Sequence, residues 1–201
     1  MSFACPPKSI RSDASMKDIP PNRKERVYLT GFMGSGKSTI GPILANTLGY
    51  EFVDIDRAIE KTMGKSVNEI FLERGEDHFR QMERNLVSDL CLKRHHVISL
   101  GGGTIADPRN FHSISTTGIV VYLKATPDQI FKRLHYKTDR PVLKDRSGER
   151  LTDEELRARI GELFTEREPY YGKADITVIT GDKRLGLTVD EIVRQLSRYL
   201  E

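Results

Sequence analysis

The sequence predicts an α/β fold in which a mostly parallel, five-stranded sheet lies between two layers of helices. Three observations lead to this prediction. Short β-prone runs alternate with segments of helical periodicity, a glycine-rich loop joins the first run to the first helix, and acidic residues or glycines follow other runs. The carboxyl ends of parallel strands meet at one edge of a sheet, so we expect these features to form a single site.

The five expected strands are short and apolar. The first ends at the glycine-rich loop, and the second ends in Asp54 and Asp56. The third has the composition of a strand buried on both faces, and three consecutive glycines follow it. In chain order, the expected strands are residues 27–30, 50–56, 96–100, 118–123 and 175–179.

Capping signals and apolar stripes mark the expected helices. Gly49 is placed to close the first helix, Ser66 and Glu69 form a capping box, and Gly75 separates two helices. Pro127 stands at the first position of a later helix. The expected helical ranges are 40–48, 57–62, 66–74, 76–93 and 108–113, a helix opened by 126–128, and then 152–170 and 188–200. Residues 135–150 are polar, basic and non-periodic, as in a functional or mobile loop.

The glycine-rich loop, residues 31–39, fits the P-loop pattern G-x-x-x-x-G-K-[ST] at every fixed position. Its glycines let backbone N–H groups turn toward an anion, and the following helix adds its positive dipole end. Lys37 would reach the β- and γ-phosphates, and the Ser38 hydroxyl would bind Mg²⁺. The alternative is a glycine turn that matches by chance. The motif therefore predicts a P-loop NTPase fold with a triphosphate held by Gly34, Ser35, Gly36, Lys37, Ser38 and Thr39.

Composition narrows the class of protein. The chain has 201 residues, 37% of them hydrophobic and 30% charged, which suits one domain with its own core. The formal net charge of +3 does not favour a nucleic-acid partner, and no run approaches the length of a membrane span. Cys5 and Cys91 form no C-x-x-C pair and fit a reducing compartment, so we expect a cytoplasmic protein. We also expect a monomer. Residues 1–25 are proline-broken and polar, and are expected to be a mobile extension before a domain at 26–201; a transit peptide and a start at Met16 are alternatives.

A second set of residues is expected at the same edge. Asp54 and Asp56 would share one face of an extended strand; the alternative is a helix N-cap and a first-turn acid. Arg80 and Arg167 could grip a carboxylate or phosphate, or be solvated surface residues. The glycines 101–103 could form a plain turn or allow a ligand to approach the backbone closely. The five histidines show no metal-binding spacing.

Together these residues resemble the shikimate kinase family. Six motifs occur in order and cover nearly the whole chain after the extension. They are the P-loop at 31–41, Phe-Val-Asp-Ile-Asp at 52–56, Gly-Glu and Phe-Arg-Gln-Met-Glu within 75–83, Leu-Gly-Gly-Gly-Thr at 100–104, Arg-Pro-Val-Leu at 140–143 and Arg-Glu-Pro-Tyr-Tyr at 167–171. Val142 departs from the usual Arg-Pro-Leu-Leu.

The resemblance implies a nucleoside monophosphate kinase-like fold and MgATP-dependent phosphorylation of the 3-hydroxyl of shikimate. It makes Asp56, Lys37 and Arg140 catalytic, with Asp56 as the base. Ser38 would bind Mg²⁺ directly and Asp54 would bind it through water. Shikimate would be held by Asp56, Arg80, Arg167, the glycines Gly101, Gly102 and Gly103, and the apolar Phe71 and Phe79, with Glu83 orienting Arg80.

On the nucleotide side, the resemblance implies that Arg133, Arg140 and Arg184 contact ATP, with Arg140 carried by a lid at about 135–150. Two other functions are compatible with parts of the pattern. A gluconate kinase-like or nucleotide kinase-like enzyme would share the P-loop and lid, but not the combination of Asp-x-Asp, Phe-Arg and Gly-Gly-Gly. A regulatory protein that has lost catalysis would not need the intact Lys37, Asp56 and Arg167.

Overall fold

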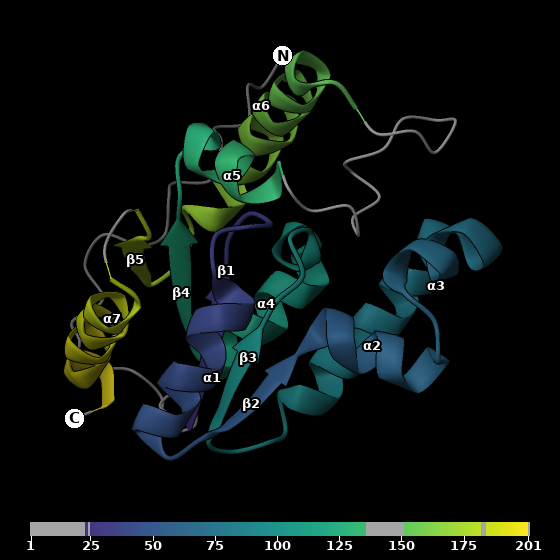
Figure 1. The fold of residues 1–201 in the computed structure, drawn as a ribbon. Coiled ribbons are helices and arrows are strands. Elements are labelled where there is room, and N and C mark those ends of the chain that lie inside the picture. Colours follow the sequence, from purple (N-terminus) through teal and green to yellow (C-terminus); the bar gives the residue numbers. More distant parts are fainter. Residues whose placement is uncertain (1–22, 24, 136–150, 182–183, 201) are drawn as a thin grey trace, which may run out of the picture.

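The structure is a computed structural model that describes residues 23, 25–135, 151–181 and 184–200. Its sheet has five strands in the order β2-β3-β1-β4-β5, and every pair of neighbouring strands is parallel (Figure 1). The strands are β1 (Arg26–Thr30), β2 (Glu51–Asp54), β3 (His96–Ser99), β4 (Ile119–Lys124) and β5 (Ile176–Ile179). The predicted fold class is confirmed.

Seven helices of the described chain cover the two faces of this sheet (Figure 1). Helices α1 and α7 lie on one face, and the other helices belong to the opposite layer. The helices are α1 (Lys37–Leu48), α2 (Ile55–Met63), α3 (Val67–Leu90), α4 (Pro108–Thr117), α5 (Pro127–Leu134), α6 (Asp153–Tyr171) and α7 (Leu185–Leu200), with a short 3₁₀ turn at Thr104–Ala106.

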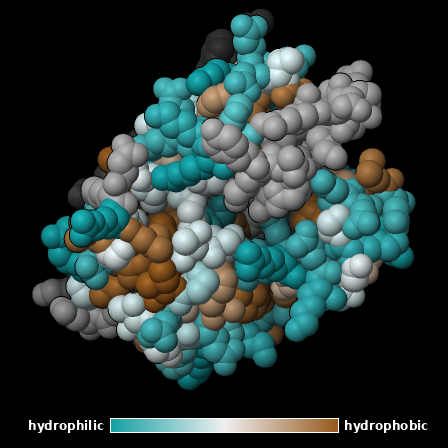
Figure 2. Space-filling view, in the orientation of Figure 1, coloured by the Kyte–Doolittle hydropathy of each residue, from teal (hydrophilic) through white to brown (hydrophobic). Residues whose placement is uncertain are grey.

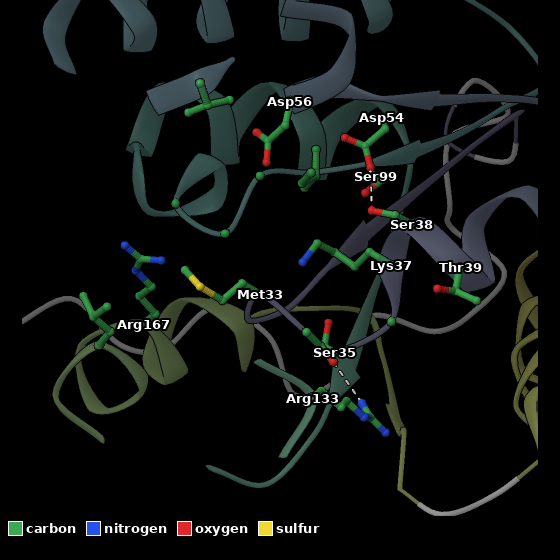
Figure 3. A pocket seen from close by; sticks show the side chains of 18 of the residues that line it. Met33, Ser35, Lys37, Ser38, Thr39, Asp54, Asp56, Ser99, Arg133 and Arg167 are labelled. Atoms are coloured by element: carbon green, nitrogen blue, oxygen red, sulfur yellow. Dashed lines mark hydrogen bonds between the residues drawn. The ribbon is translucent and has the colours of Figure 1, made fainter. Parts of the chain in front are cut away.

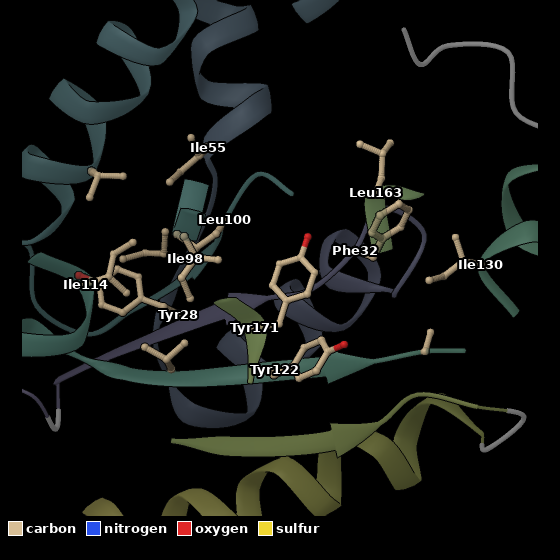
Figure 4. Packing of buried hydrophobic residues seen from close by; sticks show 14 of the residues in the cluster. Tyr28, Phe32, Ile55, Ile98, Leu100, Ile114, Tyr122, Ile130, Leu163 and Tyr171 are labelled. Atoms are coloured by element: carbon tan, nitrogen blue, oxygen red, sulfur yellow. The ribbon is translucent and has the colours of Figure 1, made fainter. Parts of the chain in front are cut away.

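The central strands divide the core into two parts because successive side chains point to opposite faces. In β1, Val27 and Leu29 pack toward α1 and α7, whereas Tyr28 packs toward the larger layer. The cluster in that layer includes Tyr28, Tyr122 and Tyr171 (Figure 4). Cys91 is partly buried at its margin, and its thiol contacts the Tyr28 hydroxyl at 3.4 Å.

The boundaries of several elements differ from the predictions. The predicted continuation of the second strand to Asp56 is wrong, because β2 ends at Asp54 and α2 begins at Ile55. The Asp54 carboxylate accepts the N–H of Arg57 at 3.3 Å, and this N-cap favours the helix over further strand. The alternative of an N-cap and a first-turn acid is therefore confirmed as the local structure. Helix α4 extends beyond the expected 108–113, and α7 begins three residues earlier than expected.

The surface of the described chain is mostly polar on the face shown in Figure 2. Apolar side chains gather there over α1 and the start of α7, where Ile43, Leu185 and Leu187 are exposed. Within the described residues, no helix combines the length and the apolar character needed to cross a membrane.

Candidate active site

A pocket of about 720 Å³ lies beyond the carboxyl ends of β1, β2 and β3, as the sequence predicts for a single site. It is lined by every predicted site residue that the structure describes except Arg184. The predicted residues in its lining are Gly34, Ser35, Gly36, Lys37, Ser38, Thr39, Asp54, Asp56, Phe71, Phe79, Arg80, Gly101, Gly102, Gly103, Arg133 and Arg167. Arg140 lies outside the described residues.

The glycine-rich loop forms one end of the pocket. Gly34 and Gly36 have φ angles of 78° and 108°, which a residue with a side chain rarely adopts. Helix α1 starts directly after them, so its first N–H groups face the loop. The Lys37 Nζ donates to the carbonyl oxygens of Gly31 at 2.7 Å and Phe32 at 3.1 Å. The loop has the geometry of an anion cradle, with a lysine directed into the cavity (Figure 3).

Arg133 and Thr180 hold this loop against the turn after β5. The Arg133 guanidinium donates to the carbonyl oxygens of Gly34 at 3.0 Å, Thr180 at 2.8 Å and Gly181 at 3.2 Å. The Thr180 hydroxyl donates to the carbonyl oxygen of Ser35 at 2.9 Å. Sequence reasoning missed Thr180, because a threonine that follows an edge strand carries no motif.

Arg184 is exposed and does not line the pocket, although its neighbour Leu185 does. Its backbone carbonyl accepts the N–H of Thr188 at 3.3 Å, beside the first turn of α7. The structure therefore does not bring Arg184 together with the other predicted nucleotide residues.

Ser38 and Asp54 present two oxygen ligands side by side. The Ser38 hydroxyl donates to Asp54 Oδ2 at 2.8 Å, from the first turn of α1 to the end of β2 (Figure 3). Oxygen donors and a single carboxylate, completed by water and phosphate, suit Mg²⁺. No group of three or more His, Cys, Asp or Glu side chains in the described ranges could hold a metal by itself. This pair thus fits a metal that arrives with a nucleotide.

Asp56 reaches the pocket from the second position of α2, not from a strand. Its side chain points into the cavity beside the glycine turn (Figure 3). A Cβ added to Gly101 would lie 2.8 Å from Asp56 Oδ1 and 3.1 Å from Glu83 Oε1. The two carboxylates therefore flank the same glycine.

Each of the three consecutive glycines lies against a different site side chain, which a Cβ at that position would crowd. A Cβ on Gly101 would meet Asp56 at 2.8 Å, one on Gly102 would meet Arg167 Nη1 at 3.2 Å, and one on Gly103 would meet Arg80 Nη2 at 2.9 Å. Hence this turn is not a plain chain reversal. It allows a carboxylate and two guanidinium groups to approach the backbone from three directions.

Arg80 is held by two carboxylates on its own helix. It donates to Glu83 Oε2 at 3.0 Å and to Glu76 Oε1 at 3.0 and 3.2 Å. Burial favours the neutral guanidine, but these carboxylates outweigh it and raise the Arg80 pKa. Sequence reasoning overlooked Glu76, although its i,i+4 spacing from Arg80 was a usable signal.

Glu83 is completely buried beneath Arg80. Its Oε1 accepts the Thr104 hydroxyl at 2.6 Å, while Oε2 accepts from Arg80. Burial raises the pKa of the Glu83 carboxyl, with Arg80 and Thr104 opposing the shift and Asp56 adding to it. On the apolar side, the Phe71 and Phe79 rings lie 5.0 Å apart, and the Arg80 guanidinium lies 5.6 Å from the Phe79 ring.

Arg167 enters the acceptor end from α6. Its guanidinium lies 5.9 Å from the Phe32 ring and next to Gly102. Figure 3 shows that Arg167, Asp56 and Lys37 all point into one cavity from different elements. Arg159 of the same helix also lines the pocket and was not foreseen, because nothing distinguishes it in sequence from other solvated helix residues.

A phosphate cradle thus faces an acceptor end made of two arginines, a carboxylate and two phenylalanines. A family model described as shikimate kinase matches residues 33–198, which is most of the chain. The chain belongs to the shikimate kinase family. Members of this family phosphorylate shikimate with ATP in aromatic biosynthesis, and this is the activity of the chain.

Two bacterial relatives named as shikimate kinases are similar to this chain over most of their length. The shikimate kinase of Chlorobium chlorochromatii is 53% identical over 174 residues, 87% of this chain and 92% of that protein. The shikimate kinase of Chlorobaculum parvum is 48% identical and covers 87% of this chain and 93% of its own length. Sequence identity therefore supports the membership of this chain in the shikimate kinase family, as the motifs do.

Solved structures give the same result. A shikimate kinase from Acinetobacter baumannii in complex with shikimate superposes with a TM-score of 0.80 at 30% identity, over 93% of this chain and all of that chain. The shikimate kinase from Bacteroides thetaiotaomicron has a TM-score of 0.79 at 34% identity, over 86% and 98%. A gluconokinase from Sinorhizobium meliloti shares only the fold, with 18% identity and a TM-score of 0.57 over 88% of this chain and 94% of that one.

Proposed function

We propose that this pocket transfers the γ-phosphoryl group of MgATP to the 3-hydroxyl of shikimate, giving shikimate 3-phosphate and ADP. The observation that supports this assignment is the arrangement of one continuous cavity, with the phosphate loop at one end and Asp56, Arg80 and Arg167 at the other. A small anionic polyol matches two guanidinium groups and one carboxylate. The Acinetobacter relative named as a shikimate complex supports the same acceptor.

In this proposal the nucleotide end positions the triphosphate. The N–H groups of residues 34–39 and the Lys37 ammonium bind the phosphates, for which Lys37 leaves the carbonyl oxygens of Gly31 and Phe32. Ser38 and Asp54 would hold Mg²⁺, which neutralises charge on the phosphate oxygens when bound. Arg133 supports the loop from behind. Arg140 is a proposal from sequence alone and would add positive charge to the transferring group.

At the acceptor end, Asp56 binds the 3-hydroxyl and accepts its proton while the hydroxyl oxygen forms a bond to the γ-phosphorus and ADP leaves. Arg80 and Arg167 bind the shikimate carboxylate, and Phe71 and Phe79 contact the apolar part of the ring. Shikimate and ATP are the expected small-molecule partners. We also expect a monomer that works in the cytoplasm.

The test is ADP release by the purified chain with MgATP and a panel of acceptors. We expect turnover with shikimate, much less with its methyl ester, and none with gluconate or a nucleoside monophosphate. Asp56→Asn should lower kcat, and Arg167→Lys should raise the KM for shikimate because an ammonium cannot form a planar, paired grip. Equal turnover of the free acid and its methyl ester would contradict the carboxylate clamp, and ATP binding without turnover on any acceptor would indicate a non-catalytic protein.

A further inference from the structure

Tyr171, the last residue of α6, lies directly behind the acceptor end of the pocket without lining it. Its side chain is completely buried. The hydroxyl donates a hydrogen bond to the carbonyl oxygen of Gly102 at 2.6 Å. This hydrogen bond should persist, because breaking it would leave the buried Tyr171 hydroxyl without a partner and without water to replace that partner.

The same hydroxyl lies beside Arg167, which is four residues earlier on α6. Both groups surround the position that a Cβ of Gly102 would occupy, with Arg167 Nη1 at 3.2 Å and the Tyr171 oxygen at 3.8 Å. Burial raises the pKa of Tyr171 to about 12, and the positive charge and hydrogen bond of Arg167 oppose the rise. Tyr171 therefore stays a neutral hydroxyl that can donate to Gly102 and accept from Arg167.

The Tyr171 ring is anchored from the opposite side. It stacks on Tyr122 of β4, with ring centroids 5.2 Å apart and an angle of 30° between the planes (Figure 4). The Tyr122 hydroxyl donates to the Glu168 carboxylate, which also pairs with Lys124. The ring thus connects the central sheet to the hydroxyl, and the hydroxyl connects to the glycine turn.

We propose that Tyr171 is a positioning residue for shikimate. Its hydroxyl sets the distance between the Arg167 guanidinium and the Gly102 carbonyl, and holds the Gly102–Gly103 peptide in one orientation. Because a peptide bond is planar and trans, fixing the Gly102 carbonyl also fixes the direction of the Gly103 N–H. This inference rests on the proposed role of Arg167 in binding the acceptor carboxylate, and adds to it the residue that places Arg167.

The experiment compares two matched tyrosine variants. Tyr171→Phe removes the hydroxyl and keeps the stacked ring. Tyr28→Phe is the control, since Tyr28 is equally buried and its hydroxyl contacts Thr117 at 2.9 Å and Cys91 at 3.4 Å, away from the pocket. The readouts are KM and kcat for shikimate, KM for ATP, equilibrium binding of shikimate by calorimetry, and the melting temperature.

We expect both variants to lose a similar amount of thermal stability, since each loses a buried hydrogen bond. Only Tyr171→Phe should weaken shikimate binding and raise its KM, by roughly tenfold, the effect of one hydrogen bond to a charged or polar group. Its kcat and its KM for ATP should be unchanged. Gly102→Ala provides a second route to the same signature, because its Cβ would displace Arg167 by steric contact.

The outcomes separate this inference from the proposed function. If Arg167→Lys leaves shikimate binding unchanged, the proposed carboxylate clamp is wrong. If Arg167→Lys weakens binding but neither Tyr171→Phe nor Gly102→Ala does so more than Tyr28→Phe, the clamp stands and the positioning role of Tyr171 is refuted. The positioning role would also be refuted if kcat fell by the same factor whether shikimate or ATP was the varied substrate, since that pattern indicates a general structural defect.

Discussion

At the scale of single residues, the site depends on the lack of a side chain at Gly101, Gly102 and Gly103. None of the three has a positive φ angle, so backbone conformation does not require glycine there. Space favours glycine instead, because a Cβ would lie 2.8 Å from Asp56 at Gly101, 3.2 Å from Arg167 at Gly102 and 2.9 Å from Arg80 at Gly103. Other side chains at these positions would push functional groups out of the pocket.

Gly103→Ala should therefore impair acceptor binding. The new Cβ would lie 2.9 Å from Arg80 Nη2 and 3.3 Å from its Cζ, so the guanidinium must move away. Because a guanidinium is the mobile end of its side chain, the fold should survive and the KM for shikimate should rise several-fold. Gly161→Ala is the control, since its Cβ meets nothing within 4 Å inside α6, and should stabilise the protein by about 0.5–1 kcal/mol with unchanged kinetics.

A second property at this scale is the buried carboxyl of Glu83. Its pKa is raised above the ordinary value of 4.5, chiefly by burial. The folded state therefore holds this proton more tightly than the unfolded state. The stabilising contribution is complete below pH 4.5 and is lost as the pH rises through the folded-state pKa.

The prediction concerns urea unfolding of Glu83→Gln and of the parent protein between about pH 4 and pH 8. The free energy of unfolding of the variant, relative to the parent, should increase with pH, since glutamine does not titrate. Glu69→Gln should show the opposite trend. Hydrogen bonds from Ser66 lower the Glu69 pKa, so the parent protein gains stability as the pH rises above that pKa. A flat difference for Glu83→Gln would mean that its pKa is not raised.

At the scale of elements, α3 supplies most of the acceptor end and is interrupted within its length. The helix begins at a capping box in which Glu69 Oε2 accepts the Ser66 N–H at 2.7 Å. At Gly75 the backbone has φ 81° and ψ 166°, a conformation essentially restricted to glycine. This break sets the direction of the second segment, which carries Phe79 and Arg80, relative to Phe71 in the first.

Gly75→Ala should destabilise the protein by about 1–3 kcal/mol, although an added Cβ would have open space around it. The cost comes from the backbone conformation alone. Urea denaturation measures it, with Gly161→Ala as the matched substitution that should stabilise. If Gly75→Ala were as stable as the parent, the break would not be strained, and the segment would tolerate a continuous helix.

At the scale of the whole molecule, Arg23 links the described chain ahead of β1 to the start of β4 and β5. Arg23 lies within the range 1–25 that we expect to be an extension, yet it forms an ion pair with Asp175 at 2.7 Å and donates to the Gly118 carbonyl at 2.9 and 3.1 Å. Both side chains are nearly buried. Asp175 Oδ2 also accepts the Val120 N–H at 2.9 Å, so Arg23 joins β4 to the start of β5.

A chain beginning at Arg23 should therefore match the full-length protein in activity and melting temperature. A chain beginning at Arg26, or the full-length Arg23→Ala variant, should lose about 1–3 kcal/mol because the Asp175 carboxylate loses a charged partner. Differential scanning calorimetry and the ADP-release assay provide the comparison. A loss already present in the chain that begins at Arg23 would show that residues before it also contribute.

Much of this molecule follows from local sequence patterns. Alternating strands and helices, the P-loop, the capping boxes and the break at Gly75 are all short-range signals, because turns, caps and phosphate cradles are built from neighbouring residues. The convergence of Lys37, Asp56 and Gly101–Gly103 also follows, since parallel strands bring their carboxyl ends to one edge. The acceptor was suggested by the order of six motifs, and not by any one of them.

Only the tertiary structure decided how these parts meet. The sequence left open whether Asp56 reaches the pocket from a strand or from a helix. It could not indicate that each of three glycines faces a different charged side chain, or that Tyr171 lies behind Arg167. Arg23 and Asp175 are 152 positions apart, and Thr180 and Ser35 are 145 apart. Such contacts leave no local pattern, because packing brings these residues together only after the sheet has formed, and charge or hydrogen-bonding capacity at one position does not specify its distant partner.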